Sequence, residues 1–224
     1  MKKNLFKVSI VALAIFATSC KSEKKNETTA EEAQEVAVAN ETAMKYVVAD
    51  SSMIEWKGEK PTGTHHGIVM VESGEIMVEA GTPQSGDFVI DMTSITVQDL
   101  EAGDGKEDLE AHLKGTVEGK EGDFFNVTEY PDATFEMTGI TEENGKTMMQ
   151  GNLTIKGKTN NISFPVTVSE EGDMISIDSE PFTIDRTKWD VNYGSKSVFD
   201  NLGDKFIYDD MELTVHVKAE KASA

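Results

Sequence analysis

The sequence has 224 residues but a single cysteine, Cys20, so no disulfide can form within the chain. Basic residues are also scarce, 21 against 41 acidic ones, which leaves a formal net charge of −20. Such a surface repels phosphate backbones, so we expect no nucleic-acid partner. The sequence contains no HExxH, CxxC or GxSxG motif, so we expect neither a metal or other cofactor nor an enzyme.

A long apolar run is missing as well. Three lysines precede a short apolar run at residues 8–17, and small residues then lead to Cys20. The run is below the roughly 20 residues that a spanning helix needs, and the pattern is typical of a signal peptide at residues 1–19. The quartet "ATSC" resembles a bacterial lipobox, which implies cleavage before Cys20 and its lipidation. We therefore expect an exported lipoprotein of the bacterial cell envelope, held on a membrane surface by acyl chains.

Large apolar side chains are rare in residues 20–44. This stretch is rich in Glu, Lys, Ala, Thr and Asn and has no aromatic residue. A segment of that composition cannot bury enough surface to order itself, which predicts a flexible tether. A short helix around residues 30–38 is an alternative that would leave its role unchanged.

Residues 45–220 alternate apolar and polar side chains with a period of two, which predicts β-strands separated by turns such as "ESGE", "EENGK" and "NLGD". One stretch, residues 103–126, breaks the alternation and places Leu109 and Leu113 four apart, which suggests a short helical insertion over one end of the sheet. Many antiparallel strands without obvious edge protection favour closure. We therefore predict an all-β fold, an extended antiparallel barrel of about eight strands.

Several motifs together resemble the YceI-like family over about residues 45–219: "YVVADSSMIEWKG", "DFFNVTEYPDATFEMTGI", "GNLTIKGKTNNISFPVTV" and "FTIDRTKWDVNYG". The resemblance implies a lipocalin-like barrel whose elongated apolar cavity holds a long isoprenoid-type or quinone-like lipid. It implies binding rather than catalysis. On this interpretation the tether would keep a lipid carrier near its source of lipid.

The strand alternation gives the candidate ligand-binding residues, which are the inward side chains of the barrel. They are Trp56, Val69, Phe88, Ile90, Met92, Phe135, Met137, Leu153, Ile155, Phe164, Val166, Phe182 and Leu213, together with Arg186. The competing interpretation is a barrel filled by its own side chains, which would act as a non-catalytic module for a protein partner in the envelope. An elongated internal cavity would favour the carrier, and a solid core would favour the interaction module.

Arg186 is the unexpected member of this set, because alternation places it with Phe182 and Ile184 on an apolar face. Three interpretations compete: a structural ion pair or cap on backbone carbonyls, a contact to the polar head of a ligand, or a bulge that turns the side chain outward. Trp189 and Tyr193 could stack on the guanidinium. We predict that Arg186 lies inside or at the mouth of the barrel.

The four histidines do not suggest a metal site. His65 and His66 are adjacent, so on one strand they face opposite sides and cannot share a metal without a bulge. His112 falls in the predicted helical insertion, and His216 falls on the polar face of the last strand.

Overall fold

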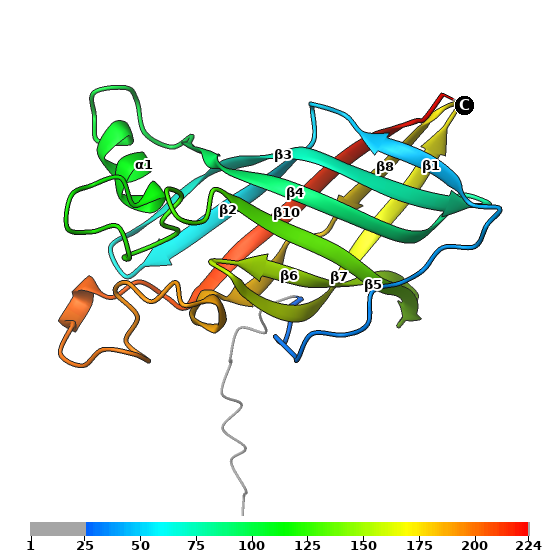
Figure 1. The fold of residues 1–224 in the computed structure, drawn as a ribbon. Coiled ribbons are helices and arrows are strands. Elements are labelled where there is room, and N and C mark those ends of the chain that lie inside the picture. Colours follow the sequence, from blue (N-terminus) through cyan, green and yellow to red (C-terminus); the bar gives the residue numbers. More distant parts are fainter. Residues whose placement is uncertain (1–25, 224) are drawn as a thin grey trace, which may run out of the picture.

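The computed structural model describes residues 26–223 (Figure 1), so the expected signal peptide and Cys20 lie outside the described residues. Within these residues the alternating segments form strands, as predicted, together with one α-helix and two short 3-10 helices. The predicted turn "ESGE" at residues 72–75 is wrong, because these residues lie inside the long strand Gly63–Glu79. In chain order the elements are β1 (Met44–Val48), β2 (Met53–Lys60), β3 (Gly63–Glu79), β4 (Thr82–Val97), α1 (Lys106–Lys114), β5 (Asp132–Glu143), β6 (Lys146–Ile155), β7 (Lys158–Glu171), β8 (Met174–Ser179), β9 (Phe182–Asp185), η1 (Arg186–Trp189), η2 (Gly203–Lys205) and β10 (Asp210–Lys221).

The strands close into a ring, which confirms the predicted barrel. The order around it is β10-β2-β3-β4-β5-β6-β7-β8, and β8 pairs back onto β10. Every ladder between named strands is antiparallel. β1 and β2 each pair with both β10 and β3, so the two strands follow one another along the same position between β10 and β3. β9 pairs with the first residues of β10. Closure leaves no long free edge, as expected for a sheet of this length.

The helical insertion is present where the sequence predicts it. Helix α1 lies over one end of the barrel (Figure 1) and turns its one buried residue, Leu113, toward the interior. The helix ends at Gly115, which adopts the left-handed conformation at φ 70°. A Cβ at this position would lie 2.4 Å from the carbonyl oxygen of Glu121, so only glycine allows the chain to turn back here.

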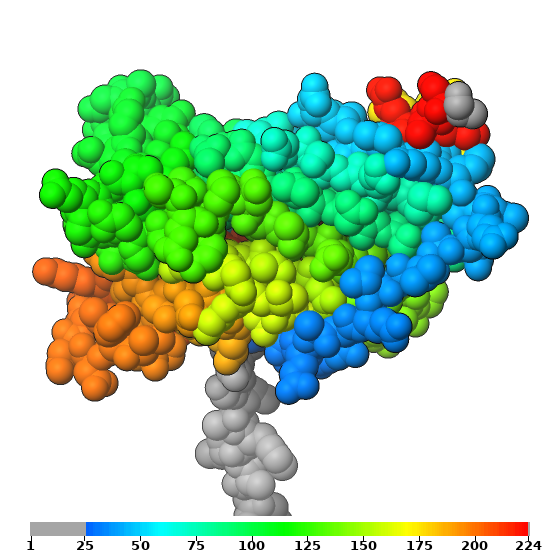
Figure 2. All heavy atoms as spheres, viewed as in Figure 1, coloured from blue at the N-terminus to red at the C-terminus, as the bar shows by residue number. Residues whose placement is uncertain are grey.

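The described part of the predicted tether, residues 26–43, lies against the barrel and hydrogen-bonds to it, which the sequence did not predict. The segment 26–43 contains no helix and runs along the outside of the barrel (Figure 2). Glu31 pairs with Asn161, and the amide of Ala37 donates to the carbonyl oxygen of Met137 at 2.9 Å. That carbonyl lies at a register shift between β5 and β6, where the ladder is irregular. The composition of this segment prevents it from forming a core of its own. It does not prevent the backbone of the segment from hydrogen bonding to the folded barrel.

The two ends of the barrel differ in how they are filled. At the end away from α1, Tyr46, Ile76, Val78 and Ile175 are completely buried and pack the interior. Toward the α1 end the core contains cavities, described below. No helix within residues 26–223 is long and apolar enough to cross a membrane.

Candidate functional site

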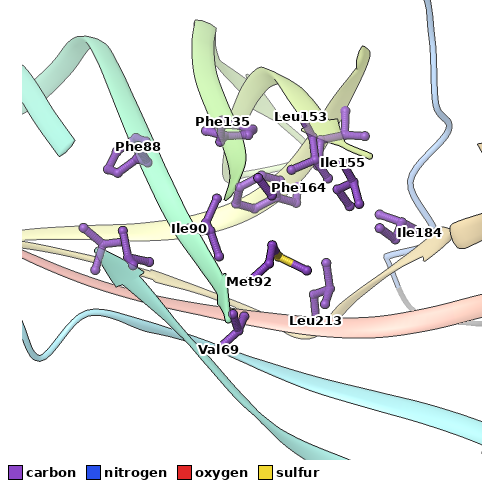
Figure 3. Packing of buried hydrophobic residues seen from close by; sticks show 14 of the residues in the cluster. Val69, Phe88, Ile90, Met92, Phe135, Leu153, Ile155, Phe164, Ile184 and Leu213 are labelled. Atoms are coloured by element: carbon purple, nitrogen blue, oxygen red, sulfur yellow. The ribbon is translucent and has the colours of Figure 1, made fainter. Parts of the chain in front are cut away.

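Two neighbouring apolar cavities lie inside the barrel. The first, of about 120 Å³, is nearer α1, and the second, of about 60 Å³, lies deeper. Both are lined by Ile54, Ile90, Leu153 and Leu213, so these four side chains stand where the cavities meet. Figure 3 shows Ile90, Leu153 and Leu213, from three different strands, pointing into the same interior. These shared side chains separate the two cavities, so a continuous passage would require them to move.

Most of the predicted inward residues line these cavities. Trp56, Val69, Met92, Ile155 and Arg186 line the first; Phe88, Phe135, Phe164 and Phe182 line the second; Ile90, Leu153 and Leu213 line both. Met137 and Val166 are buried but line neither cavity. The sulfur of Met137 lies near Gly86, and Val166 pairs with Thr147 and Ser179, so these two side chains pack the core away from the cavities.

The first cavity also has walls that strand periodicity missed. Leu113, Phe124 and Phe125 come from the insertion, and Val191, Ile207 and Tyr208 come from the loop that follows η1. None of these residues belongs to a strand, so alternation gives them no face. The motif "DFF" marks two of them as part of the family resemblance, but without a role.

A row of phenylalanines crosses the second cavity. The ring centroids of Phe88 and Phe135 are 6.1 Å apart, those of Phe135 and Phe164 are 5.6 Å apart, and Phe164 stacks on Phe182 at 4.4 Å. Aromatic pairs in this range attract each other beyond their burial alone. The row therefore forms a firm wall of the second cavity, whereas the boundary between the cavities consists of the aliphatic side chains of Ile54, Ile90, Leu153 and Leu213.

Arg186 is 4% exposed and caps backbone carbonyls, which is the first of the three interpretations. Its Nε donates to the carbonyl of Tyr208 at 3.1 Å, its Nη2 donates to that of Ile207 at 3.2 Å, and its Nη1 donates to that of Val191. Burial lowers the pKa of Arg186 from its ordinary value, while the negative charges of Asp209 and Asp185 act in the opposite direction. The outward-turned arginine is excluded.

The strand that was predicted to contain Arg186 is shorter than predicted. It ends at Asp185, whose carboxylate accepts a hydrogen bond from the Thr187 amide at 3.0 Å, and the 3-10 helix begins there. The proposed stacking of Trp189 and Tyr193 on Arg186 is wrong. Trp189 is fully buried and donates its indole N–H to the carbonyl of Leu153 at 2.9 Å, and Tyr193 packs elsewhere.

Tyr193 helps to fasten the insertion to the loop after η1. The ring of His112 makes edge contacts with Phe124 at 5.0 Å and Tyr193 at 4.8 Å between centroids. The Nε2 of His112 lies 2.7 Å from the Oδ2 of Asp123. Lys156 adds hydrogen bonds to the carbonyls of Gly122 and Asp190. These contacts join the insertion to the loop after η1, two segments that are far apart in the sequence. Together the two segments close the end of the first cavity.

The other histidines make local contacts. Asp99 accepts a hydrogen bond from the amide of His66 at 2.9 Å and lies 2.8 Å from Nδ1 of His65. His216 lies 2.8 Å from Asp178 on the outer face. Within the part of the chain that the structure describes, no group of three His, Cys, Asp or Glu side chains could hold a metal ion.

Comparisons with known proteins agree with this architecture. A BcnA crystal structure from Burkholderia cenocepacia is 23% identical, covers 75% of this chain and 95% of its own, and superposes with a TM-score of 0.56. A polyisoprenoid-binding domain from Saccharophagus degradans, implicated in plant cell wall breakdown, is 12% identical, covers 81% and 100%, and has a TM-score of 0.54. The comparison with curated proteins found no match. Residues 46–219 match the YceI-like domain, and the chain therefore belongs to the YceI-like family.

Proposed function

We propose that this protein is an exported, membrane-anchored lipoprotein that binds one long apolar lipid of the isoprenoid or quinone-like class inside its barrel. The observation that carries the proposal is the pair of adjoining cavities, of which the deeper has only apolar lining residues. The family match and a structural neighbour described as polyisoprenoid-binding support the ligand class. Burial contributes roughly 0.8 kcal/mol for each CH₂ group removed from water, so affinity needs no catalytic group.

The size of the cavities sets a condition on binding. An apolar cavity of about 150 Å³ holds a molecule the size of benzene, so the first cavity, at about 120 Å³, takes roughly one isoprene unit as it stands. A longer chain requires the side chains between the cavities to rotate. Met92 in the first cavity and Met149 in the second are unbranched and flexible, which suits them to yield to a lipid.

The same small volume favours the second candidate, a barrel filled by its own side chains that binds a protein partner in the envelope. Native mass spectrometry of gently purified protein separates the two functions. The carrier is expected to retain a lipid whose mass gives its class. A chain that carries no bound mass, and takes up none from isoprenoid-containing vesicles, would favour the interaction module.

A pair of variants tests whether retained lipid lies in these cavities. Leu153 lines both, so Leu153→Phe is expected to abolish lipid retention at a cost of about 1–3 kcal/mol in stability. Met137→Phe enlarges a completely buried side chain outside the cavities and is the matched control. Equal lipid content in the two folded variants would place the ligand elsewhere.

The anchor is tested separately, since it depends on Cys20 alone. Cys20→Ser is expected to release the protein from the membrane fraction and to remove the mass of the acyl chains. A variant that still sediments fully with membranes would show that the lipobox assignment is wrong.

A further inference from the structure

The packing of the N-terminal segment limits how far the barrel can stand from its anchor. The Asn26 side chain donates to the carbonyl oxygen of Pro181 at 3.0 Å, and the Asn26 carbonyl accepts from the amide of Thr183 at 3.2 Å. Only five residues separate Cys20 from Asn26. Even fully extended, that length of chain spans about 20 Å. An acylated Cys20 therefore keeps the side of the barrel that carries Asn26 close to the bilayer.

The same side of the barrel carries an apolar loop. Asn26 and Tyr208 border one surface groove, and in Figures 1 and 2 the orange loop of residues 193–208 and the start of the described chain both lie on the lower side of the barrel. The loop exposes two consecutive apolar residues, Val198 at 47% and Phe199 at 49%. Tyr193 and Tyr208 are also exposed, and tyrosine is a side chain favoured at membrane–water interfaces.

The charge of this loop differs from that of the whole chain. Residues 193–208 hold two lysines, Lys196 and Lys205, and two aspartates, Asp200 and Asp204, so the formal charge of the loop is zero, against −20 for the whole chain. Lys196 places its Nζ 4.2 Å from the centre of the Phe206 ring. A locally neutral, partly aromatic surface suits a zwitterionic lipid surface, whereas the acidic remainder of the molecule opposes an anionic one.

The loop is also part of the cavity. Ile207 and Tyr208 line the first cavity, and Arg186 binds the carbonyls of both residues. We infer that residues 193–208 form a docking surface for a zwitterionic bilayer, with Val198 and Phe199 inserted among the headgroups. Docking here places the end of the first cavity against the membrane from which a lipid would enter. This inference rests on the proposed function, because it requires the lipid anchor at Cys20.

The test uses the full acylated chain in phosphatidylcholine vesicles. Because the thiol of Cys20 is then blocked, Phe199→Cys provides one labelling site for an environment-sensitive fluorophore. Val47→Cys is the matched control, since Val47 is 43% exposed and lies in β1, away from the loop in Figure 1. Quenching by nitroxide-labelled phosphatidylcholine is expected to be at least about threefold stronger at residue 199 than at residue 47, because the inserted probe lies at the depth of the headgroups.

The outcomes separate the docking surface from the proposed function. Equal quenching at the two positions in acylated protein would overturn the docking surface and leave the anchor and lipid binding standing. The intact mass of the same sample reports acylation. Protein that carries no acyl chain overturns the anchor, and the docking orientation with it, while native mass spectrometry still reports any lipid in the barrel.

Discussion

Arg186 donates its Nε–H to the carbonyl oxygen of Tyr208 across 3.1 Å, and so joins the first turn after β9 to the residues just before β10. Its hydrogen bond to the Val191 carbonyl reaches the start of the same loop. One buried guanidinium therefore holds both ends of the segment that walls the first cavity. Its planar set of five N–H donors suits this task, because the carbonyls approach from different directions.

Replacement of Arg186 should therefore affect stability whether or not lipid is bound. Arg186→Met keeps much of the length and leaves three carbonyls without this donor, each of which costs about 1–3 kcal/mol if it stays buried. Removal of a buried charge offsets part of that loss. We expect a net decrease of about 2–4 kcal/mol in the free energy of unfolding, measured by urea denaturation.

Arg186→Lys is the control for charge, since its single ammonium cannot reproduce the planar fork. It should also destabilise the protein. If Arg186→Met were as stable as the wild type and lost only its lipid, the arginine would serve a ligand headgroup instead.

Gly151 and Phe135 give a prediction about the wall of the second cavity. The Phe135 ring covers Gly151 so closely that an added Cβ would lie 2.2 Å from the end of the ring. Gly151→Ala must displace that ring, which also contacts Phe88 and Phe164, and we expect a loss of about 1–3 kcal/mol in stability.

Gly139 supplies the matched control on the neighbouring strand. A Cβ there would meet nothing closer than the side chain of Gln150 at 3.7 Å. Gly139→Ala should therefore change the free energy of unfolding by less than about 0.5 kcal/mol. Similar losses in both variants would point to a general cost of replacing glycine in these strands rather than to the Phe135 contact.

The sequence predicted the barrel because alternation is a local signal repeated in every strand. It placed Phe88, Ile90 and Leu153 correctly on the inner face for the same reason. Alternation cannot say how far along the barrel the interior is filled, so it could not separate Met137 and Val166 from the residues that line a cavity. Whether an inward side chain lines a cavity or fills the core depends on how side chains from several strands pack at the same height along the barrel axis.

Contacts between distant segments were beyond the reach of the sequence. The hydrogen bonds of Arg186 depend on where the loop of residues 190–209 folds back, and no local pattern fixes that path. The docking of residues 26–43 was missed for a related reason. The composition of a segment indicates whether it can form a core of its own. It does not indicate whether the segment can bind to a barrel formed by other residues, as the Ala37 amide does when it donates to a barrel carbonyl.

Asn152 is a buried residue that holds this N-terminal segment. Its Oδ1 accepts from the amide of Gln34 at 2.9 Å, and its Nδ2 donates to the Gln34 carbonyl at 2.8 Å. Asn152→Ala removes both bonds and also the one that Asn161 Nδ2 donates to Oδ1 at 3.0 Å. We therefore expect a loss of about 1–3 kcal/mol in stability and faster hydrogen exchange at Gln34 and its neighbours. Asn40→Ala is the control, because the side chain of Asn40 donates to Glu79 at the exposed surface. Unchanged exchange at Gln34 in the Asn152 variant would mean that other contacts suffice to hold the segment.

Asp99 gives a prediction about pH. Burial alone would raise the pKa of this carboxyl, but the hydrogen bond from the His66 amide, the contact with His65 and the charge of His65 outweigh it and lower the pKa below the ordinary 3.8. A carboxyl whose pKa is lowered on folding stabilises the folded state above its unfolded pKa, and this contribution is lost as the pH falls through the folded pKa.

Asp99→Asn cannot titrate, so it should be less stable than the wild type at pH 7, by on the order of 1 kcal/mol. The difference in the free energy of unfolding should shrink as the pH falls below about 4, where the wild type alone loses the ionised Asp99. Urea denaturation of both proteins from pH 7 down to pH 3 measures this difference, and a gap that stays constant over the whole range would show that the charge of Asp99 does not stabilise the fold.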